Sequence, residues 1–464
     1  MFRLITAIAA LAAACCVTPA ISAPPDPNTF GKQVDALVES QMHAQQVPGV
    51  AVAVLHKGEV VVAKGYGLAN IEHHVPVTTD TIFQSGSVGK MFTAVAVMTQ
   101  VEHGKIKLDD PVSKYLPGTP PGWSPITVRH LLTHTSGIAN YGEDFNYKRD
   151  YTDDELLKEA YALPLDFKPG ARWSYSNTGY EVLGILVKKA TGRSYLEILQ
   201  SEVFKPLGMK TARGISDLDI VPHRAAGYQL VDGVLKNQDW TSATMNSTAD
   251  GSLYFSIKDM IAWNHGVESA AVIGSDGWKQ IYTPVRLNSG KPYPYGFGWQ
   301  LDEAGGQPRY HHGGAWAGFR VYYSRYLGDQ LAIILLTNSA ATDLDKFVDG
   351  IAGLWDPTLV APPARPKPEP EIDRRVTALI EAARAGALTP KDLPLAKPDF
   401  VKVMNDHLAP ALKPLPPLSK LELTNRREAG DDTEYTYTAT FGDRTMKVHF
   451  ALAPGNQVSQ FYVY

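Results

Sequence analysis

The sequence predicts an α+β protein in which one antiparallel sheet is assembled from both ends of a large domain around a helical insert. β-rich runs separated by turns occur at residues 50–66 and return at residues 295–336. Between them, apolar residues at helical spacing follow capping residues, which indicates helices. A sheet drawn from both ends of the domain is the simplest arrangement that buries these runs.

The overall composition is that of a folded globular chain. A length of 464 residues is typical of two or three domains, with 44% apolar and 20% charged residues. The formal net charge is −4, and no basic stripe is present. Nucleic acid is therefore not an expected partner.

The N-terminus predicts a secretory signal peptide at residues 1–23 and a periplasmic or secreted protein. Arg3 precedes an apolar run at residues 4–17, and small residues follow at 18–23. The run is short for a bilayer span, so a membrane anchor is the weaker alternative, as is lipid modification at Cys15. Because Cys15 and Cys16 both lie in this segment, the mature chain would contain no disulfide.

The first half of the predicted sheet follows an N-terminal helix at residues 35–45. Residues 50–55 and 59–66 are β-rich and flank His56-Lys57-Gly58, which predicts a hairpin. After a short extended segment, a second apolar helix begins near Ser87 and ends at His103-Gly104, where glycine is a natural C-terminal stop.

Helices dominate the insert, and strands follow it. The predicted helices cover residues 127–133, 152–161, 178–190 and 256–263, with Thr127 capping the first and Asn177 or Thr178 capping the third. The predicted strands cover residues 295–301, 319–326 and 331–336, and a last helix covers 344–354.

A proline-rich linker at residues 361–370 separates the predicted large domain, 24–360, from a small α+β domain at 371–464. Its predicted helices cover 372–385 and 400–408. Its predicted strands form an antiparallel meander at 421–425, 434–441, 445–452 and 458–464, with a turn at Gly442-Asp443. This tail carries no cluster of chemically reactive residues.

Ser87 and Lys90 form the first candidate site, at the junction of a strand and a helix. At positions i and i+3 the two side chains share one helix face, so the Lys amine can reach the Ser hydroxyl. A serine becomes a good nucleophile when a neighbouring base takes its proton, and a lysine can do so in its neutral form. A chance Ser-x-x-Lys on an ordinary helix is the structural alternative.

Two other readings of this stretch fail. A phosphate-binding loop would need glycine at position 84 and Ser or Thr at position 91, where the chain has Gln84 and Met91. A nucleophile elbow of the Gly-x-Ser-x-Gly type would need glycine at position 85, which is Ser85.

Two further clusters contain candidate functional residues. Residues 169–180 include Tyr175 and Asn177, and the structural alternative is an aromatic loop with a capping asparagine. Residues 310–319 include His312 and Gly314, where glycines let a strand approach another backbone closely; the alternative is a β-bulge. Paired histidines also suggest a metal site, but no His-Glu-x-x-His pattern accompanies them, so no metal or cofactor is expected.

Together the three clusters resemble the penicillin-recognising serine hydrolases, which include class C β-lactamases, D-alanyl-D-alanine carboxypeptidases and β-lactamase-like esterases. The match consists of Ser87-x-x-Lys90, then Tyr175-x-Asn177, then His312-x-Gly314, in the family's order. Residues 127–138 and 206–209 also look like that family. The resemblance covers about residues 34–355 and implies a β-lactamase-like sheet flanked by helices.

The resemblance also implies a role for each residue. Ser87 would be acylated, Lys90 would accept its proton, and Tyr175 would pass a proton to the leaving group and help activate the deacylating water. Asn177 would hold the substrate's amide or carbonyl. The backbone N–H groups of Ser87 and Ala315 would form the oxyanion hole beside Gly314.

One departure from the family pattern bears on substrate. The family's β-lactamases carry Lys-Thr-Gly where this chain has His312-Gly313-Gly314, so a charged, carboxylate-binding lysine is replaced by a group that is mostly neutral at pH 7. This favours an exported hydrolase of short-chain esters or D-amino-acid peptides. The alternatives are a β-lactamase or D-alanyl-D-alanine carboxypeptidase proper, and a slow-turnover binding protein that keeps the fold.

Overall fold

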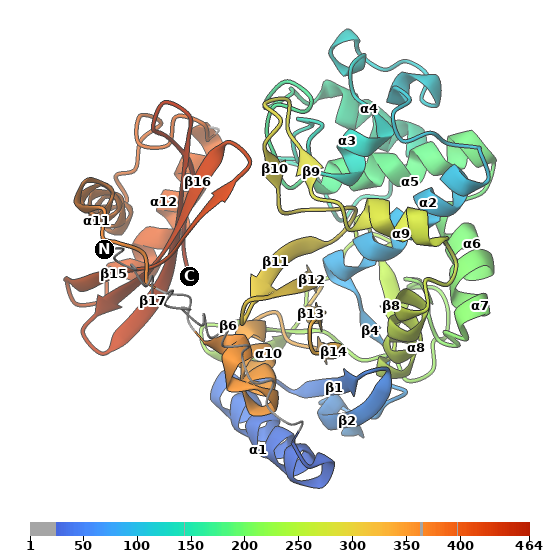
Figure 1. The fold of residues 1–464 in the computed structure, drawn as a ribbon, viewed down its shortest axis with the longest axis horizontal. Helices are drawn as coiled ribbons and strands as arrows, with labels where there is room; N and C mark the ends of the chain where they lie inside the picture. The colour runs from blue at the N-terminus through green and yellow to red at the C-terminus, as the bar shows by residue number, and fades with distance from the viewer. Residues whose placement is uncertain (1–24, 143, 362–364, 397) are drawn as a thin grey trace, which may run out of the picture.

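A computed structural model describes residues 25–142, 144–361, 365–396 and 398–464. The predicted signal peptide lies outside the described residues, as does part of the predicted linker. In the described part of the chain, no helix has the length and apolar character needed to cross a membrane. The structure combines an antiparallel sheet with helices, which confirms the predicted α+β class (Figure 1).

The main sheet is built from both ends of the large domain, as predicted. Its seven strands run in the order β11-β12-β13-β14-β1-β2-β3. From the C-terminal end come β11 (Gln300–Ala304), β12 (Gln307–Trp316), β13 (Phe319–Tyr326) and β14 (Leu331–Thr337). From the N-terminal end come β1 (Gly49–His56), β2 (Glu59–Asn70) and β3 (Val75–Pro76). The central pair β1 and β14 aligns Val50 with Thr337.

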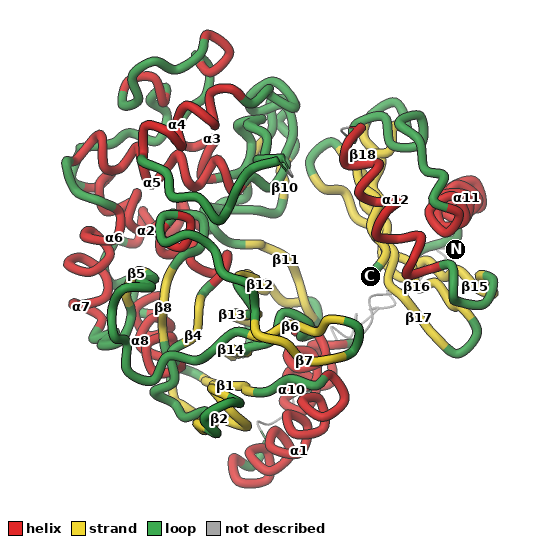
Figure 2. The backbone as a smooth tube through the Cα atoms, turned by 180° about the vertical axis from the view of Figure 1, so that it is seen from behind, coloured by secondary structure: helices red, strands yellow, loops and turns green. Residues whose placement is uncertain are grey.

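Alternation along β1 divides the core into two layers, because successive side chains of a strand point to opposite faces. Val50, Val52 and Val54 pack with α1 (Pro27–Gln45) and α10 (Leu344–Trp355). The alternate residues Ala51 and Ala53 face the helical region on the other side. Figure 2 shows α1 and α10 side by side at one end of the molecule, away from the other helices.

The helical region covers the second face of the sheet. Its elements are α2 (Gly89–Glu102), α3 (Val128–Leu132), α4 (Asp153–Ala162), α5 (Asn177–Thr191), α6 (Tyr195–Ile198), a π-helical turn (Leu199–Phe204), α7 (Lys205–Leu207), α8 (Ile257–Glu268) and α9 (Ser275–Ile281). Short 3-10 turns lie at Gly86–Val88, Val112–Lys114, Pro121–Trp123, Met245–Ser247 and Pro357–Val360. Thr127 caps α3 as predicted.

Three small sheets, one of three strands and two of two strands, complete this region. They are β4 (Phe83–Gln84), β5 (Arg213–Gly214) and β8 (Leu253–Phe255) in one sheet, β6 (Tyr228–Val231) with β7 (Val234–Asn237), and β9 (Val285–Arg286) with β10 (Pro292–Tyr293).

Two local predictions are wrong. Ser176, rather than Asn177 or Thr178, caps α5, because its hydroxyl accepts from Gly179 N at 3.0 Å. The strand predicted at residues 295–301 begins only at Gln300. Gly298 has a φ of +75°, and a Cβ there would lie 2.7 Å from Lys90 O, so this stretch bends to pass close to α2.

The C-terminal module consists of α11 (Pro370–Ala385), α12 (Pro398–Leu412) and a four-stranded meander. Its strands are β15 (Leu418–Ala429), β16 (Asp432–Phe441), β17 (Arg444–Ala453) and β18 (Gln457–Val463), paired in sequence order. The module has its own hydrophobic cluster. The predicted antiparallel meander is confirmed, whereas the domain boundaries stay a prediction.

Candidate active site

Ser87 lies on a 3-10 turn that leads directly into α2. Gly86 has a φ of +47°, which lets the chain reverse between β4 and this turn. The preceding Ser85 fixes the turn, because its hydroxyl donates to Gly251 O at 2.7 Å and accepts from Leu253 N at 3.1 Å. The nucleophile candidate is thus anchored to a segment about 160 residues away, and Ser87 itself is half-buried.

Lys90 is fully buried and lies 3.2 Å from the Ser87 hydroxyl through its Nζ. The same nitrogen donates to Asn177 Oδ1 at 2.8 Å and to Asp250 O at 2.5 Å. Both of these partners can only accept, so in a neutral amine they would occupy the two N–H groups. The lone pair of the nitrogen is then directed at Ser87, which is the geometry that a general base requires.

Tyr175 lies against the same amine. The centroid of its ring is 4.8 Å from Lys90 Nζ, and the ring of Tyr180 approaches from 5.5 Å. Within the described residues, the buried hydroxyl of Tyr175 has no hydrogen-bond partner. Ser87, Lys90, Tyr175 and Asn177, which lie in separate clusters of the sequence, therefore converge on one place.

Asn140 holds the segment that carries Tyr175 and Asn177, and sequence reasoning missed it. Its Nδ2 donates to Tyr175 O at 2.9 Å, and its Oδ1 accepts from Asn177 N at 2.7 Å. Both bonds join residues more than 30 positions apart. The neighbouring residues 127–138 look family-like, and this was the only signal near Asn140 in the sequence.

The edge of β12 passes directly beside the nucleophile turn. Pairing between β11 and β12 ends at His311, so the later residues of β12 do not pair with β11. A Cβ on Gly314 would lie 2.2 Å from Ser85 O and 3.0 Å from Ser87 N, and a Cβ on Gly86 would lie 2.4 Å from Ala315 N. Glycine at both positions brings the backbone N–H groups of Ser87 and Ala315 into one small region, as an oxyanion hole requires.

His312 is buried behind this edge, and its two ring nitrogens are both occupied. Its Nε2 lies 3.1 Å from the Tyr295 hydroxyl, which also lies 3.1 Å from His134 Nε2. Ser176 N donates to His134 Nδ1 at 3.0 Å. If both rings are neutral, the bond from Ser176 N fixes the proton of His134 on Nε2, which then donates to the Tyr295 hydroxyl. The Tyr295 hydroxyl donates in turn to His312 Nε2, and His312 Nδ1–H donates to Gly313 O.

Burial keeps both histidines neutral. It lowers the pKa of His312 to about 3, and Lys90, when protonated, adds to this effect. It likewise lowers the pKa of His134, again with a contribution from Lys90. The site therefore has no cationic group at His312. Direct contact between His312 and substrate stays a prediction, as do the roles of the other predicted residues.

A buried carboxyl, Glu181, lies one turn along α5 from Asn177. It is 4% exposed, and its Oε2 has no partner among the described residues. Burial and the nearby Asp250 raise the pKa of this carboxyl to about 8, while the Tyr141 hydroxyl and, when protonated, Lys90 oppose the increase. The protonated acid is thus the form present at pH 7.

Nothing in the described residues is arranged as a metal centre, since no group of three or more His, Cys, Asp or Glu side chains there could hold an ion. His311 lies on the opposite face of β12 from His312. Its ring bonds Asp302 at 3.1 Å and the Tyr322 hydroxyl at 2.7 Å, which makes it part of a separate buried network.

Known proteins resemble this chain in sequence. A family model described as Beta-lactamase matches residues 34–353. Penicillin-binding protein 4* of Bacillus subtilis is 28% identical over 327 residues, covering 66% of this chain and 71% of that protein. A D-aminopeptidase of Gluconobacter oxydans is 29% identical, covering 67% of this chain but only 59% of that enzyme.

Solved structures share the fold. An octameric penicillin-binding protein homologue from Pyrococcus abyssi superposes with a TM-score of 0.62 at 22% identity, over 93% of this chain and 99% of that one. D-amino acid amidase from Ochrobactrum anthropi has the same TM-score and identity, over 70% of this chain and 98% of that one. Because the family model matches well over half of the sequence, the chain belongs to the Beta-lactamase family and is a serine hydrolase.

Proposed function

We propose that this protein is an exported hydrolase that cleaves short-chain esters or D-amino-acid peptides and amides through an acyl-enzyme on Ser87. The observation that carries the proposal is the set of contacts around Lys90. Its amine lies 3.2 Å from the Ser87 hydroxyl while two acceptors occupy its other positions. This arrangement prepares one hydroxyl for deprotonation by one base.

In the acylation step Ser87 Oγ attacks the carbonyl carbon of the substrate, and its proton passes to Lys90 Nζ. The carbonyl oxygen becomes an oxyanion that accepts hydrogen bonds from Ser87 N–H and Ala315 N–H. The C–O or C–N bond to the leaving group then breaks. The leaving group takes a proton from Tyr175, which regains one from Lys90, so Lys90 is neutral again after acylation. The Tyr175 hydroxyl has no hydrogen-bond partner in the described part of the chain.

In the deacylation step water attacks the acyl-enzyme carbonyl and gives up a proton to the same Lys90 and Tyr175 pair. The acid product forms as the bond to Ser87 Oγ breaks, and Ser87 regains its proton. The same two N–H groups stabilise the second oxyanion, so both steps use a single set of donors. Each donor of this kind is worth about 10² to 10³ in rate.

The proposed substrate class rests on the lack of a positive charge at His312. A neutral buried ring with both nitrogens occupied offers no charge to a substrate carboxylate. Esters, amides and substrates with an uncharged end at that position therefore fit better than β-lactams. The D-aminopeptidase relatives support the D-amino-acid arm of the proposal.

A β-lactamase or D-alanyl-D-alanine carboxypeptidase proper is the second candidate. It is supported by the similarity to penicillin-binding protein 4* and to a putative penicillin-binding protein, both of Bacillus subtilis.

The test is a turnover panel of p-nitrophenyl acetate, D-alanine p-nitroanilide and a chromogenic cephalosporin, run on wild type and Ser87→Ala. We expect ester and D-amino-acid turnover that Ser87→Ala abolishes, together with a fluorophosphonate adduct mapped to Ser87. Full activity in Ser87→Ala would exclude the assignment. Turnover of the cephalosporin alone would favour the second candidate.

Export rests on the sequence of residues 1–23. Expression of the full chain in a Gram-negative host should give a periplasmic protein whose N-terminus follows Ala20 or Ala23. Recovery of an uncleaved chain beginning at Met1 in the cytoplasm would contradict export, without affecting the assignment of Ser87.

A further inference from the structure

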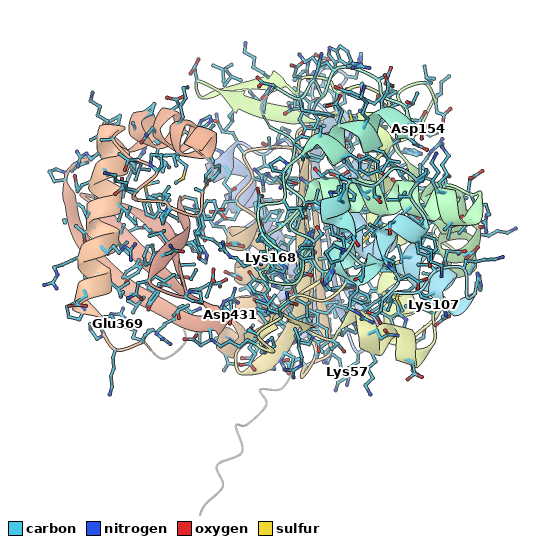
Figure 3. The ribbon with its side chains drawn as sticks, turned by 90° about the horizontal axis from the view of Figure 1, so that it is seen from above. Lys57, Lys107, Asp154, Lys168, Glu369 and Asp431 are labelled. Atoms are coloured by element: carbon cyan, nitrogen blue, oxygen red, sulfur yellow. The ribbon has the colours of Figure 1, made fainter. Side chains whose placement is uncertain are left out.

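The turn between β15 and β16, residues Ala429 to Asp432, contacts the hydrolase part of the molecule. Gly430 N donates to Pro292 O at 2.9 Å. Ala429 is 1% exposed and packs in a small cluster with Val285, Tyr293, Tyr295 and Trp173. In Figure 3 Asp431 lies where the C-terminal module meets the larger body, whereas Glu369 lies farther out on the module.

We call residues Ala429 to Asp432 the tip, and polar contacts surround the apolar packing of its Ala429. Arg172 lies 3.6 Å from Asp432, and Lys291 lies 3.7 Å from Asp431. The Tyr293 hydroxyl donates to Glu434 at 3.3 Å, a carboxylate that is 4% exposed. Apolar packing and charge pairs therefore hold the tip of the C-terminal module against the hydrolase part of the chain.

A short series of aromatic rings leads from the tip to the catalytic amine. Tyr293, which contacts the tip, stacks on Trp173 with 4.3 Å between ring centroids and 11° between planes. Trp173 lies 6.4 Å from Tyr175 and 5.5 Å from Tyr295. Tyr175 lies against Lys90, so the rings of Tyr293, Trp173 and Tyr175 lie in series between the tip and the base.

We propose that the β15–β16 turn is a positioning element of the active site. The turn holds Tyr293 and Trp173 in place, and these rings keep Tyr175 against Lys90. The C-terminal module is then needed for turnover, beyond any recruitment of partners. This inference rests on the proposed function, because it assumes that Tyr175 handles the proton of the leaving group. The residues of the β15–β16 turn act through these rings and not by binding substrate.

The full-length protein offers a matched pair of variants. Gly430 and Gly455 both occupy hairpin turns of the module with positive φ, +62° and +79°. A Cβ on Gly430 would lie 2.5 Å from Leu287 of the hydrolase part, whereas a Cβ on Gly455 would meet nothing within 4 Å. Gly430→Ala and Gly455→Ala therefore share the backbone strain. Only Gly430→Ala crowds Leu287 Cδ1, which is 5% exposed and has little room to move away from the turn.

The measurement is kcat and KM for p-nitrophenyl acetate, with the melting temperature of each variant. We expect Gly430→Ala to lower kcat about tenfold with KM within about twofold of wild type, because a small displacement of Tyr175 slows proton transfer without removing binding contacts. Gly455→Ala should match wild type. Equal kcat in the two variants overturns the inference.

Charge reversal across the interface keeps the test decisive if Gly430→Ala does not fold. Arg172→Asp and Asp432→Arg each place like charges together, and the double variant restores an opposite pair. Lowered kcat in both single variants with recovery in the double supports the positioning role. Unchanged singles, or a double variant without recovery, overturn it. If Ser87→Ala is inactive while these variants match wild type, only this inference fails and the proposed function stands.

Discussion

The close approach of β12 to the nucleophile turn predicts a large effect of one methyl group. In Gly314→Ala the new Cβ would lie 2.2 Å from Ser85 O and 3.0 Å from both Ser87 N and Val88 N. Non-bonded carbon and oxygen atoms need at least about 3.2 Å, so the strand must retreat by about 1 Å. That shift moves Ala315 N–H away from the oxyanion that it would bind.

The magnitude follows from the geometry of the donor. A hydrogen bond of about 2.9 Å that lengthens by about 1 Å is lost, and one lost oxyanion donor lowers kcat by about 10² to 10³. The same retreat slows acylation, because the oxyanion forms in that step. Substrate affinity should change far less than kcat, since the donor acts mainly on the transition state.

The assay combines kcat and KM on p-nitrophenyl acetate with the rate of labelling by a fluorophosphonate. The matched control is Gly313→Ala, because its Cβ would lie 3.5 Å from the Tyr322 ring, an ordinary contact. Both variants should retain the circular dichroism of wild type. If folded Gly314→Ala turns over and labels as fast as Gly313→Ala, the oxyanion hole is not where the proposal puts it.

Three further results are expected. Burial raises the pKa of Glu181 to about 8 from an ordinary 4.5, so the folded chain keeps a proton that the unfolded chain has lost. Stability should therefore fall as pH rises from about 4.5 to 8, by at most about 1.4 kcal/mol per unit, and Glu181→Gln should remove this loss. Urea unfolding at pH 5, 7 and 9 checks it, and equal slopes for both proteins would contradict it. Asn140→Ala should lower kcat about tenfold by freeing the backbone of Tyr175, with unchanged ester turnover as the contrary result. Tyr295→Phe leaves two buried imidazole nitrogens without partners and should destabilise the fold by about 2 to 4 kcal/mol, so an unchanged melting temperature would count against the two Tyr295 hydrogen bonds.

The parts of the site that local sequence specifies could be predicted. The spacing of Ser87 and Lys90 places both side chains on one helical turn, and the structure has them in contact. The resemblance to a known family brought in Tyr175 and Asn177 together with their order in the chain. Strand alternation and turn residues predicted β1, β2, β13 and β14 of the main sheet and the C-terminal meander.

What could not be predicted depends on contacts between distant segments. Asp250 reaches Lys90 through a backbone carbonyl, which any residue type could supply, so no sequence pattern marks it. Asn140 acts through a side chain, but its partners become neighbours only after folding. Ser176 competes with two other good capping residues, and only the backbone geometry selects it.

The pairing of β1 with β14 has a consequence for biosynthesis. Val50 meets Thr337, about 290 residues later in the chain, so the middle of the sheet cannot form until most of the polypeptide has left the ribosome. At about 5 to 20 residues per second this takes roughly 15 to 60 s. During that interval β1, which is apolar on both faces, has no partner along one edge. Recombinant yield should therefore respond to chaperone supply and to slower translation at low temperature more strongly than to changes in the mature surface.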